Sequence, residues 1–279
     1  MVDRQFTAYG VRIELRVDCR AMLDALEQDP TRLPFGWRAV EDQEPDGPVS
    51  LRYELLTSGG ASPSYRLYAG VHLLADALGL TDAAVALASH AEFFVAQHAP
   101  NHLFVHAGVI AWRGRAIVMP GASFAGKTTL VQAWLDAGAT YYSDEFAVLD
   151  RAGRVNPFAR PLSIRDGATA VSRRVCVSSL GAESGTTPLP VGLVLVTSYR
   201  PGARWRPRRL TPAQALLALM RHTVAARGNP AHSMPILKQA VSGRVAFAGV
   251  RGEARPQVSW VREHVGAPMF PALSQFGAI

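Results

Sequence analysis

The sequence predicts an α/β protein with two modules, and three observations lead to this prediction. The chain has 279 residues and is 48% hydrophobic, which is enough to bury the core of one large or two modest domains. Residues 1–100 alternate short strand patterns with helical ones, as in an α+β module. Residues 101–279 run from an apolar strand through a glycine-rich loop into a helix, as in α/β domains. We therefore expect a boundary near residue 100.

The first module should contain short strands and two helices. Strand patterns cover residues 10–17, 49–56 and 65–68, and helical patterns cover residues 19–28 and 82–98. Pro100 should end the second helix. The acidic, turn-rich segment at residues 41–48 predicts a solvated loop between two strands.

The second module should begin with a strand, a turn and a second strand. We expect strands at 103–110 and 116–120, the glycine-rich loop at 121–128, a helix at 129–138 and a strand from residue 140. Further along, we expect an apolar central strand at 188–197, a basic loop at 204–209, and a helix at 211–222 with Pro212 in its first turn.

The glycine-rich loop predicts phosphate binding. Residues 121–129 read Gly-Ala-Ser-Phe-Ala-Gly-Lys-Thr-Thr, so Gly121 and Gly126 stand where backbone curls around phosphate oxygens. Lys127 can reach the outer phosphates, and the Thr128 hydroxyl can bind Mg²⁺. A P-loop that holds ATP with Mg²⁺ is the prediction, and a coincidental turn is the alternative. The expected nucleotide-binding residues are Gly121, Ala122, Ser123, Phe124, Ala125, Gly126, Lys127, Thr128 and Thr129.

Acidic residues and a histidine flank the predicted P-loop. Asp144 and Glu145 follow the next strand, where a carboxylate can hold Mg²⁺ or accept a proton from an attacking hydroxyl. The alternative is a solvated acidic turn or a helix cap. His106 lies in the strand before the loop, and on its own it is typical of a hydrogen-bonded core residue.

These segments together resemble a known family. The likeness rests on His106-Ala-Gly-Val, Gly114-Arg-Ala-Ile-Val, the loop GASFAGKTTL, Ala137-Gly-Ala and Tyr142-Ser-Asp-Glu. They resemble the C-terminal kinase domain of HPr kinase/phosphorylase and of HPr-kinase-related proteins. The resemblance is clear over residues 103–165 and weak out to about residue 225.

The resemblance implies a fold and a reaction. It implies an HPr-kinase/PEP-carboxykinase-like P-loop domain with a mixed twisted sheet, unlike the doubly wound Ras-like NTPases. It also implies transfer of the γ-phosphoryl group of ATP to a serine hydroxyl of a small protein or peptide. In this reading Asp144 is the base, His106 positions it, and Lys127 binds phosphate. Thr128, Asp144 and Glu145 would then hold the metal.

Two departures narrow the family. The Val-Arg-Gly-Leu-Gly-Ile type of signature is missing, and Glu145 replaces an aspartate. These differences favour the HPr-kinase-related proteins, some of which phosphorylate lasso-peptide precursors at a terminal serine, over HPr kinase/phosphorylase itself. A non-catalytic ATP-binding sensor or scaffold and a small-molecule kinase stay open as alternatives. By exclusion, residues 1–100 are expected to present the acceptor or to select the partner.

Other side chains receive weaker assignments. Arg160 can bind a nucleotide phosphate or a substrate carboxylate through its planar fork, or lie in an exposed loop. The basic cluster at 204–209 is interpreted as a solvated loop in preference to a docking site. Five histidines form no metal-binding spacing with one another and receive no role, namely His90, His98, His102, His222 and His232.

Composition limits the partners and the compartment. The net charge of +7 suits anionic partners, but scattered arginines without a nucleic-acid module argue against nucleic-acid binding. No run approaches the roughly 18 apolar residues of a membrane span, and no signal-peptide core is found, so a cytoplasmic protein is expected. Cys19 and Cys176 are interpreted as ordinary thiols. HPr kinase/phosphorylase is a hexamer, so a homo-oligomer stays open here.

Overall fold

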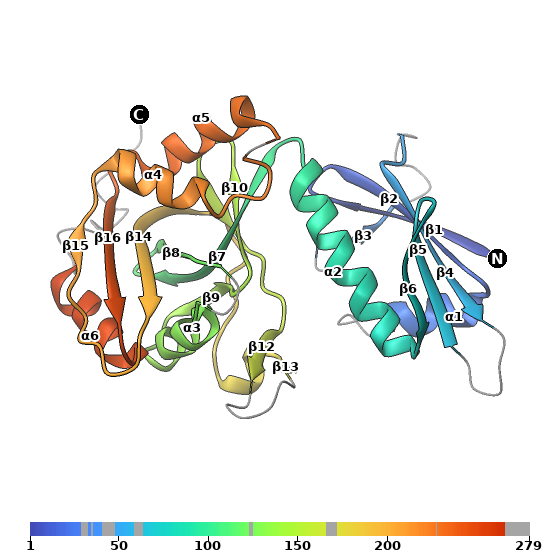
Figure 1. The fold of residues 1–279 in the computed structure, drawn as a ribbon, viewed down its shortest axis with the longest axis horizontal. Coiled ribbons are helices and arrows are strands. Elements are labelled where there is room, and N and C mark those ends of the chain that lie inside the picture. The colour runs from blue at the N-terminus through green and yellow to red at the C-terminus, as the bar shows by residue number, and fades with distance from the viewer. Residues whose placement is uncertain are drawn as a thin grey trace. The chain divides into compact units, whose positions relative to one another are not determined.

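The computed structural model describes residues 1–28, 33–34, 36–40, 48–58, 64–122, 125–165, 172–226 and 228–265. The chain forms two compact units, Met1–Asn101 and His102–Ile279 (Figure 1). The sequence-based boundary was placed after residue 100. Both units mix helices with sheets, so the α/β class is confirmed. A search of the described helices finds none that combines the length and apolar character needed to cross a membrane.

The first unit is built around a six-stranded sheet. Its elements are β1 (Val2–Ala8), β2 (Val11–Val17), α1 (Arg20–Glu27), β3 (Arg38–Ala39), β4 (Leu51–Ser58), β5 (Ser64–Ala69), β6 (His72–Leu78) and α2 (Leu80–His98). The strand order is β3-β1-β2-β4-β5-β6. β2 and β4 run parallel, and the other neighbouring strands run antiparallel.

One face of this sheet is apolar and packs against the helices. Alternate residues of β2 and β4, such as Ile13, Leu15 and Leu55, are fully or almost fully buried. α2 lies against β5 and β6, and α1 lies against β2 (Figure 1). The period-two pattern that predicted strands in this region therefore marks the face that forms the core.

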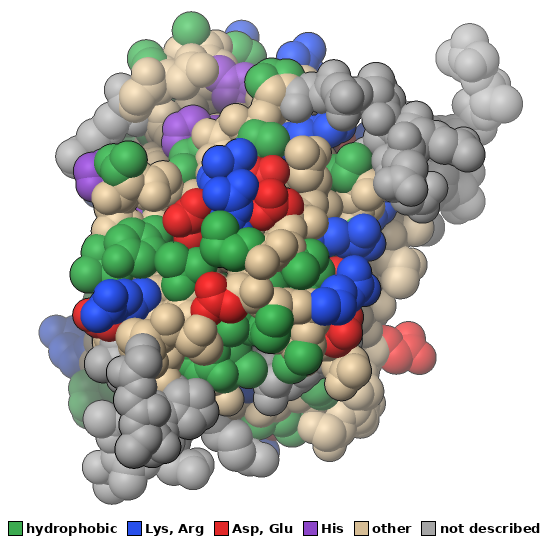
Figure 2. Space-filling model, turned by 90° about the vertical axis from the view of Figure 1, so that its right-hand side faces the viewer, with side chains coloured by type: hydrophobic (Ala, Val, Ile, Leu, Met, Phe, Trp, Pro, Cys, Tyr) green, Lys and Arg blue, Asp and Glu red, His purple; other side chains and the backbone are tan. Residues whose placement is uncertain are grey.

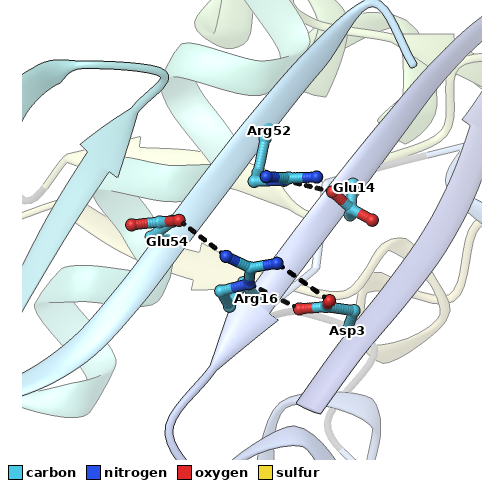
Figure 3. A network of polar contacts seen from close by, with 5 residues as sticks. All are labelled: Asp3, Glu14, Arg16, Arg52 and Glu54. Atoms are coloured by element: carbon cyan, nitrogen blue, oxygen red, sulfur yellow. Dashed lines mark hydrogen bonds and ion pairs between the residues drawn. The ribbon is translucent and has the colours of Figure 1, made fainter. Parts of the chain in front are cut away.

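The other face of the sheet carries charges (Figure 2). Arg16 donates to Asp3 at 2.7 Å and to Glu54 at 3.4 Å, and Arg52 donates to Glu14 (Figure 3). The strand register places each of these pairs directly opposite one another across β1, β2 and β4. Opposite charges at facing positions stabilise strand pairing, so we interpret the network as part of the sheet's own construction.

The second unit holds the remaining elements. They are β7 (His102–Trp112), β8 (Arg115–Pro120), α3 (Lys127–Asp136), β9 (Thr140–Ser143), β10 (Phe146–Asp150), β11 (Arg154–Asn156), β12 (Leu162–Arg165), β13 (Ser172–Val175), the 3₁₀ turn η1 (Val177–Leu180), β14 (Leu189–Tyr199), β15 (Arg208–Arg209), α4 (Pro212–Met220), α5 (Pro230–Val241), β16 (Val245–Arg251) and α6 (Ala254–His264).

An eight-stranded mixed sheet forms the centre of this unit. The main path is β11-β10-β7-β8-β14-β16-β15, with β9 paired to β7. β8, β14 and β16 run parallel, whereas β7 and β10 run antiparallel to their neighbours. The sheet curls, because β11 pairs with β10 and also with β14. β12 and β13 form a separate two-stranded hairpin.

Helices cover both faces of the central sheet. α4 and α5 pack together on one face, where Leu219 and Leu237 join the buried side chains of β7 and β10 (Figure 1). α3 and α6 pack together on the other face, where Trp134 and Val258 join buried residues of β8 and β14. The P-loop segment, between β8 and α3, therefore emerges from a strand that is buried on both sides.

Most expected elements are present with shifted ends. The helices expected at 19–28, 82–98 and 211–222 correspond to α1, α2 and α4. The basic segment at 204–209 is irregular up to β15, which forms an edge strand of the sheet. Residues 41–47, from the expected acidic loop, lie outside the described residues.

Candidate active site

The P-loop segment follows directly from β8. Every residue of β8 is buried, so a fixed strand delivers the chain to Gly121. Gly126 has a φ of 78°, a left-handed conformation that favours glycine, and α3 begins at the next residue. The backbone thus turns sharply into a helix N-terminus, where N–H groups and the helix dipole favour an anion. Ser123 and Phe124, from the expected nucleotide-binding set, lie outside the described residues.

Lys127 lies across the loop. Its Nζ donates to the carbonyl oxygens of Gly121 and Ala122, each at 3.0 Å. Burial lowers the pKa of Lys127, and the charges of Glu145 and Asp144 act in the opposite direction. The ammonium group therefore has backbone partners in place of a bonded carboxylate, and phosphate oxygens arriving at the loop can replace them.

Asp144 lies beneath the start of α3. It is 5% exposed, and one of its oxygens accepts from the Thr128 hydroxyl at 3.2 Å. It also accepts from the Tyr141 hydroxyl at 3.0 Å and the Ser163 N–H at 3.4 Å. Burial raises the pKa of Asp144, and the Tyr141 hydrogen bond lowers it. Three donors already surround this carboxylate.

The two acidic residues diverge at a tight turn between β9 and β10. The Ser143 hydroxyl accepts from the N–H groups of Glu145 at 3.1 Å and Phe146 at 2.9 Å, which fixes the turn. Asp144 points into the protein, whereas Glu145 is 37% exposed. Neighbours in the sequence therefore face different surroundings.

His106 lies beside Glu145, and among the described residues no hydrogen bond or ion pair joins it to Asp144. Its Nδ1 is 3.6 Å from a Glu145 oxygen, and its ring packs on Phe146 with centroids 4.6 Å apart. Burial lowers the pKa of His106, Lys127 lowers it further, and Glu145 raises it. The His106 carbonyl also accepts from the Gly121 N–H at 3.1 Å. A side chain expected to position Asp144 thus lies against Glu145, at the entrance of the loop.

His222 is a neighbour of His106 that the sequence analysis left without a role. Val105 and Thr223 form an antiparallel bridge, and the His106 N–H donates to the His222 carbonyl at 2.8 Å. This register places the two histidines opposite each other on one face. Burial lowers the pKa of His222, and the charge of Lys127 lowers it as well. Histidine spacing in the sequence could not reveal this pairing, because it depends on the path of the chain after α4.

Arg160 and Tyr141 connect this site to a neighbouring cavity. The Tyr141 hydroxyl lies 2.9 Å from the Arg160 carbonyl oxygen and 3.0 Å from an Asp144 oxygen, so its single hydrogen is shared between two acceptors, and the charge of Arg160 lowers the pKa of Asp144. A cavity of about 570 Å³ lies between the loops that carry Arg160 and Glu183. Cys176 on its wall is a free, exposed thiol, as is Cys19 in the first unit.

The oxygen donors fit a magnesium ion that arrives with a nucleotide. The Thr128 hydroxyl and the Asp144 carboxylate converge beside the helix N-terminus, and Mg²⁺ prefers one or two such oxygens together with water and phosphates. Among the described residues, no group of three or more His, Cys, Asp or Glu side chains could hold a metal ion. Glu145 contacts His106 and has no contact with Thr128 among the hydrogen bonds and ion pairs of the site.

No protein-family model matches the chain, and a search among curated proteins finds no match.

Proposed function

We propose that the second unit is an ATP-dependent kinase that transfers the γ-phosphoryl group to a serine hydroxyl of a small protein or peptide. One observation carries this proposal: Thr128, the first threonine of the P-loop motif, is hydrogen-bonded to the buried Asp144. A loop, a lysine, a hydroxyl and an acidic strand end thus meet at one helix N-terminus. Phosphoryl transfer needs this combination for positioning and for charge stabilisation.

The proposal assigns nucleotide binding to the P-loop and to Lys127. Backbone N–H groups of the loop and of α3 cradle the phosphates, and the Nζ of Lys127 leaves the Gly121 and Ala122 carbonyls to bond the outer phosphates. Thr128 and Asp144 would hold Mg²⁺, which when bound would supply positive charge to the phosphates. Tyr141 and Ser163 keep the Asp144 carboxylate in place for this role.

The geometry favours Glu145 as the base. Asp144 is almost fully buried, already accepts from three donors and is assigned to the metal, so a more exposed carboxylate is the better candidate for the base. Glu145 is partly exposed, and His106 lies 3.6 Å from it. The Glu145 carboxylate takes the serine proton while the serine oxygen bonds to the γ-phosphorus. The bond from that phosphorus to the bridging oxygen breaks, and ADP leaves.

The acceptor class rests on the family resemblance. The segments around His106, the P-loop and Asp144 resemble the HPr-kinase-related proteins, which supports both serine as the acceptor and an HPr-kinase/PEP-carboxykinase-like fold for this unit. The mixed, curled sheet is compatible with that fold. We further propose that the first unit presents the acceptor.

The test is phosphoryl transfer from ATP to peptides encoded by neighbouring genes, with the product located by mass spectrometry. We expect the native chain to phosphorylate a serine and Glu145→Gln to lose most of this activity. Glu263→Gln, which changes an exposed glutamate of α6, is the matched control and should keep the native rate.

Each other outcome selects an alternative. If the chain binds ATP but neither consumes it nor transfers phosphate to any peptide, the result would favour a non-catalytic ATP-binding sensor over a kinase. Consumption of ATP with a small hydroxyl compound in place of a peptide would identify a small-molecule kinase. A fully active Glu145→Gln would leave the kinase standing and remove Glu145 as its base.

A further inference from the structure

Arg251 connects the end of β16 to the P-loop. It is 2% exposed, and its Nη2 donates to the Gly126 carbonyl at 2.9 Å across 125 positions of sequence. Its Nη1 donates to the Gly252 carbonyl at 2.9 Å. A guanidinium group at the end of β16, the second strand along the sheet from β8, thus holds the last turn of the loop before α3.

The charge of Arg251 lacks a bonded counter-charge. A buried cation is normally paired with a carboxylate, because burial without a partner is costly. Within the described part of the chain, no carboxylate forms an ion pair with Arg251, and its Nε has no hydrogen-bond partner. Burial lowers the pKa of Arg251, and the nearby but unbonded charge of Glu253 raises it. The Tyr199 ring, 5.4 Å from its Cζ, gives a cation–π contact. The adjacent N-terminus of α3 adds positive potential instead of relieving it.

A side chain at position 126 would collide with the Arg251 guanidinium group. A Cβ added at this position would lie 2.5 Å from the Arg251 Nη2, closer than real atoms approach. Its φ of 78° also disfavours other residues. The second glycine of the motif therefore leaves room for the Arg251 side chain as well as for a bound phosphate.

We propose that Arg251 is a positioning residue for a nucleoside polyphosphate bound at the P-loop. By holding the Gly126 carbonyl it orients the loop and the first N–H groups of α3 towards the phosphates. The polyphosphate in turn adds negative charge near a buried guanidinium that no carboxylate of the described residues bonds. Polyphosphate binding and the packing of β16 on the loop therefore stabilise one another, and this coupling is reciprocal. The inference rests on the nucleotide binding of the proposed function, and it does not require phosphoryl transfer.

The test compares Arg251→Gln and Arg251→Lys with the native chain in titrations with ATP and with inorganic tripolyphosphate, without acceptor. We expect Arg251→Gln to weaken both ligands by about tenfold or more, since hydrogen bonds to charged groups are the strong ones. Arg251→Lys should restore part of the affinity. In the transfer assay the loss should appear in KM for ATP more than in kcat.

Arg244→Gln is the matched control. Arg244 precedes β16 at its opposite end, is partly buried, and also has an Nε without a hydrogen-bond partner. We expect it to keep the native affinity for ATP within about twofold even if its melting temperature falls. The melting temperature without ligand and the shift produced by ATP, measured on each variant, separate a general loss of stability from a loss of binding.

Several results would overturn the proposal. Native affinity in Arg251→Gln would do so, as would equal losses in Arg251→Gln and Arg244→Gln. If Arg251→Gln does not fold, Arg251→Lys provides the test. Native affinity for ATP in Arg251→Lys would contradict a role for the guanidinium group that bonds two carbonyls. If the affinity for ATP depends on Arg251 but the chain never transfers phosphate, the kinase proposal fails and this inference stands. If the chain transfers phosphate but Arg251→Gln keeps the native affinity for ATP, the kinase proposal stands and this inference fails.

Discussion

The two units each gather charged side chains, and they treat those charges differently. On the open face of the first sheet, Arg16 and Arg52 face carboxylates that the strand register places directly opposite them. Beside the P-loop, Lys127 and Arg251 bond to backbone carbonyls, and Arg251 is almost fully buried. Charges that form ion pairs with one another within the sheet contribute to the stability of the fold. Under the proposed function, a bound phosphate would supply the counter-charge to the cations that bond carbonyls beside the P-loop.

Replacing Lys127 should give the largest effect. Lys127→Ala removes the cation that reaches the outer phosphates, so we expect kcat to fall by about a hundredfold or more, because loss of one key electrostatic group costs about 3 kcal/mol or more. Initial rates with saturating ATP measure this. The control is Lys238→Ala, an exposed lysine of α5, which should keep the native rate. Turnover retained in Lys127→Ala would contradict the phosphate role.

Substitutions of the neighbouring residues Asp144 and Glu145 should impair different functions, namely ATP binding and turnover. Asp144→Asn removes the negative charge beside Thr128, so the affinity for ATP with Mg²⁺ should fall by about tenfold. Glu145→Gln should keep this affinity and lower kcat by about a hundredfold or more. Calorimetric titration and initial rates, made on both variants, separate the effects. The opposite pattern would return the base to Asp144, as the sequence analysis had it.

Acid should weaken the first unit through His90. The hydroxyl of the buried Tyr53 lies 2.7 Å from the His90 Nδ1, and burial lowers the pKa of His90 below its ordinary value of 6.5. The unfolded chain therefore binds this proton more readily than the folded one. The contribution to stability is complete above pH 6.5, the ordinary value, and is lost as the pH falls from there through the lower pKa of the folded state.

Melting temperatures between pH 7.5 and 5.5 check this expectation. The native chain should lose more stability over this interval than His90→Gln, because the variant has no imidazole to protonate. The acid-induced change in the native chain includes His102, His106 and His222, whose pKa values are also lowered by burial. Parallel losses in the two proteins would show that His90 contributes nothing.

Breaking the surface network should give the smallest effect. Arg16→Met leaves Asp3 and Glu54 without their partner, yet exposed ion pairs contribute about 0.2–1 kcal/mol each. We expect a loss of stability of about 1 kcal/mol that shrinks at high salt, with ATP affinity unchanged. Arg20→Met, which breaks an exposed pair within α1, is the control. A large change in ATP affinity would undo the contrast between the two charge clusters.

Local patterns explain what could be predicted from the sequence. The α/β class, the helices α1, α2 and α4, and the strand before the P-loop follow from spacing and capping within short windows. Thr211, for example, caps α4 through a reciprocal bond with Gln214. The P-loop motif predicts Lys127 and Thr128, the position after a strand predicts Asp144 and Glu145, and the family resemblance adds His106; the structure brings these residues together at one end of α3.

Distant pairings explain what could not be predicted. β1 and β6 lack the alternation that marked their neighbours, so they were missed. His222 meets His106 only because the chain after α4 runs beside β7. Arg251 reaches Gly126 only because β16 lies next to β14 in the sheet. The pairing of His106 with Glu145 likewise depends on the Ser143 turn, which sends the two acidic side chains in different directions.

The central claim is that the P-loop site transfers the γ-phosphoryl group of ATP. The most direct test supplies the native chain and its candidate acceptor peptides with ATP labelled at either the α- or the γ-phosphate, in otherwise identical reactions containing Mg²⁺. We expect only the γ-label to reach the acceptor, and Lys127→Ala to abolish the transfer. Transfer of the α-label, or tight ATP binding with neither label transferred to any acceptor, would contradict the central claim.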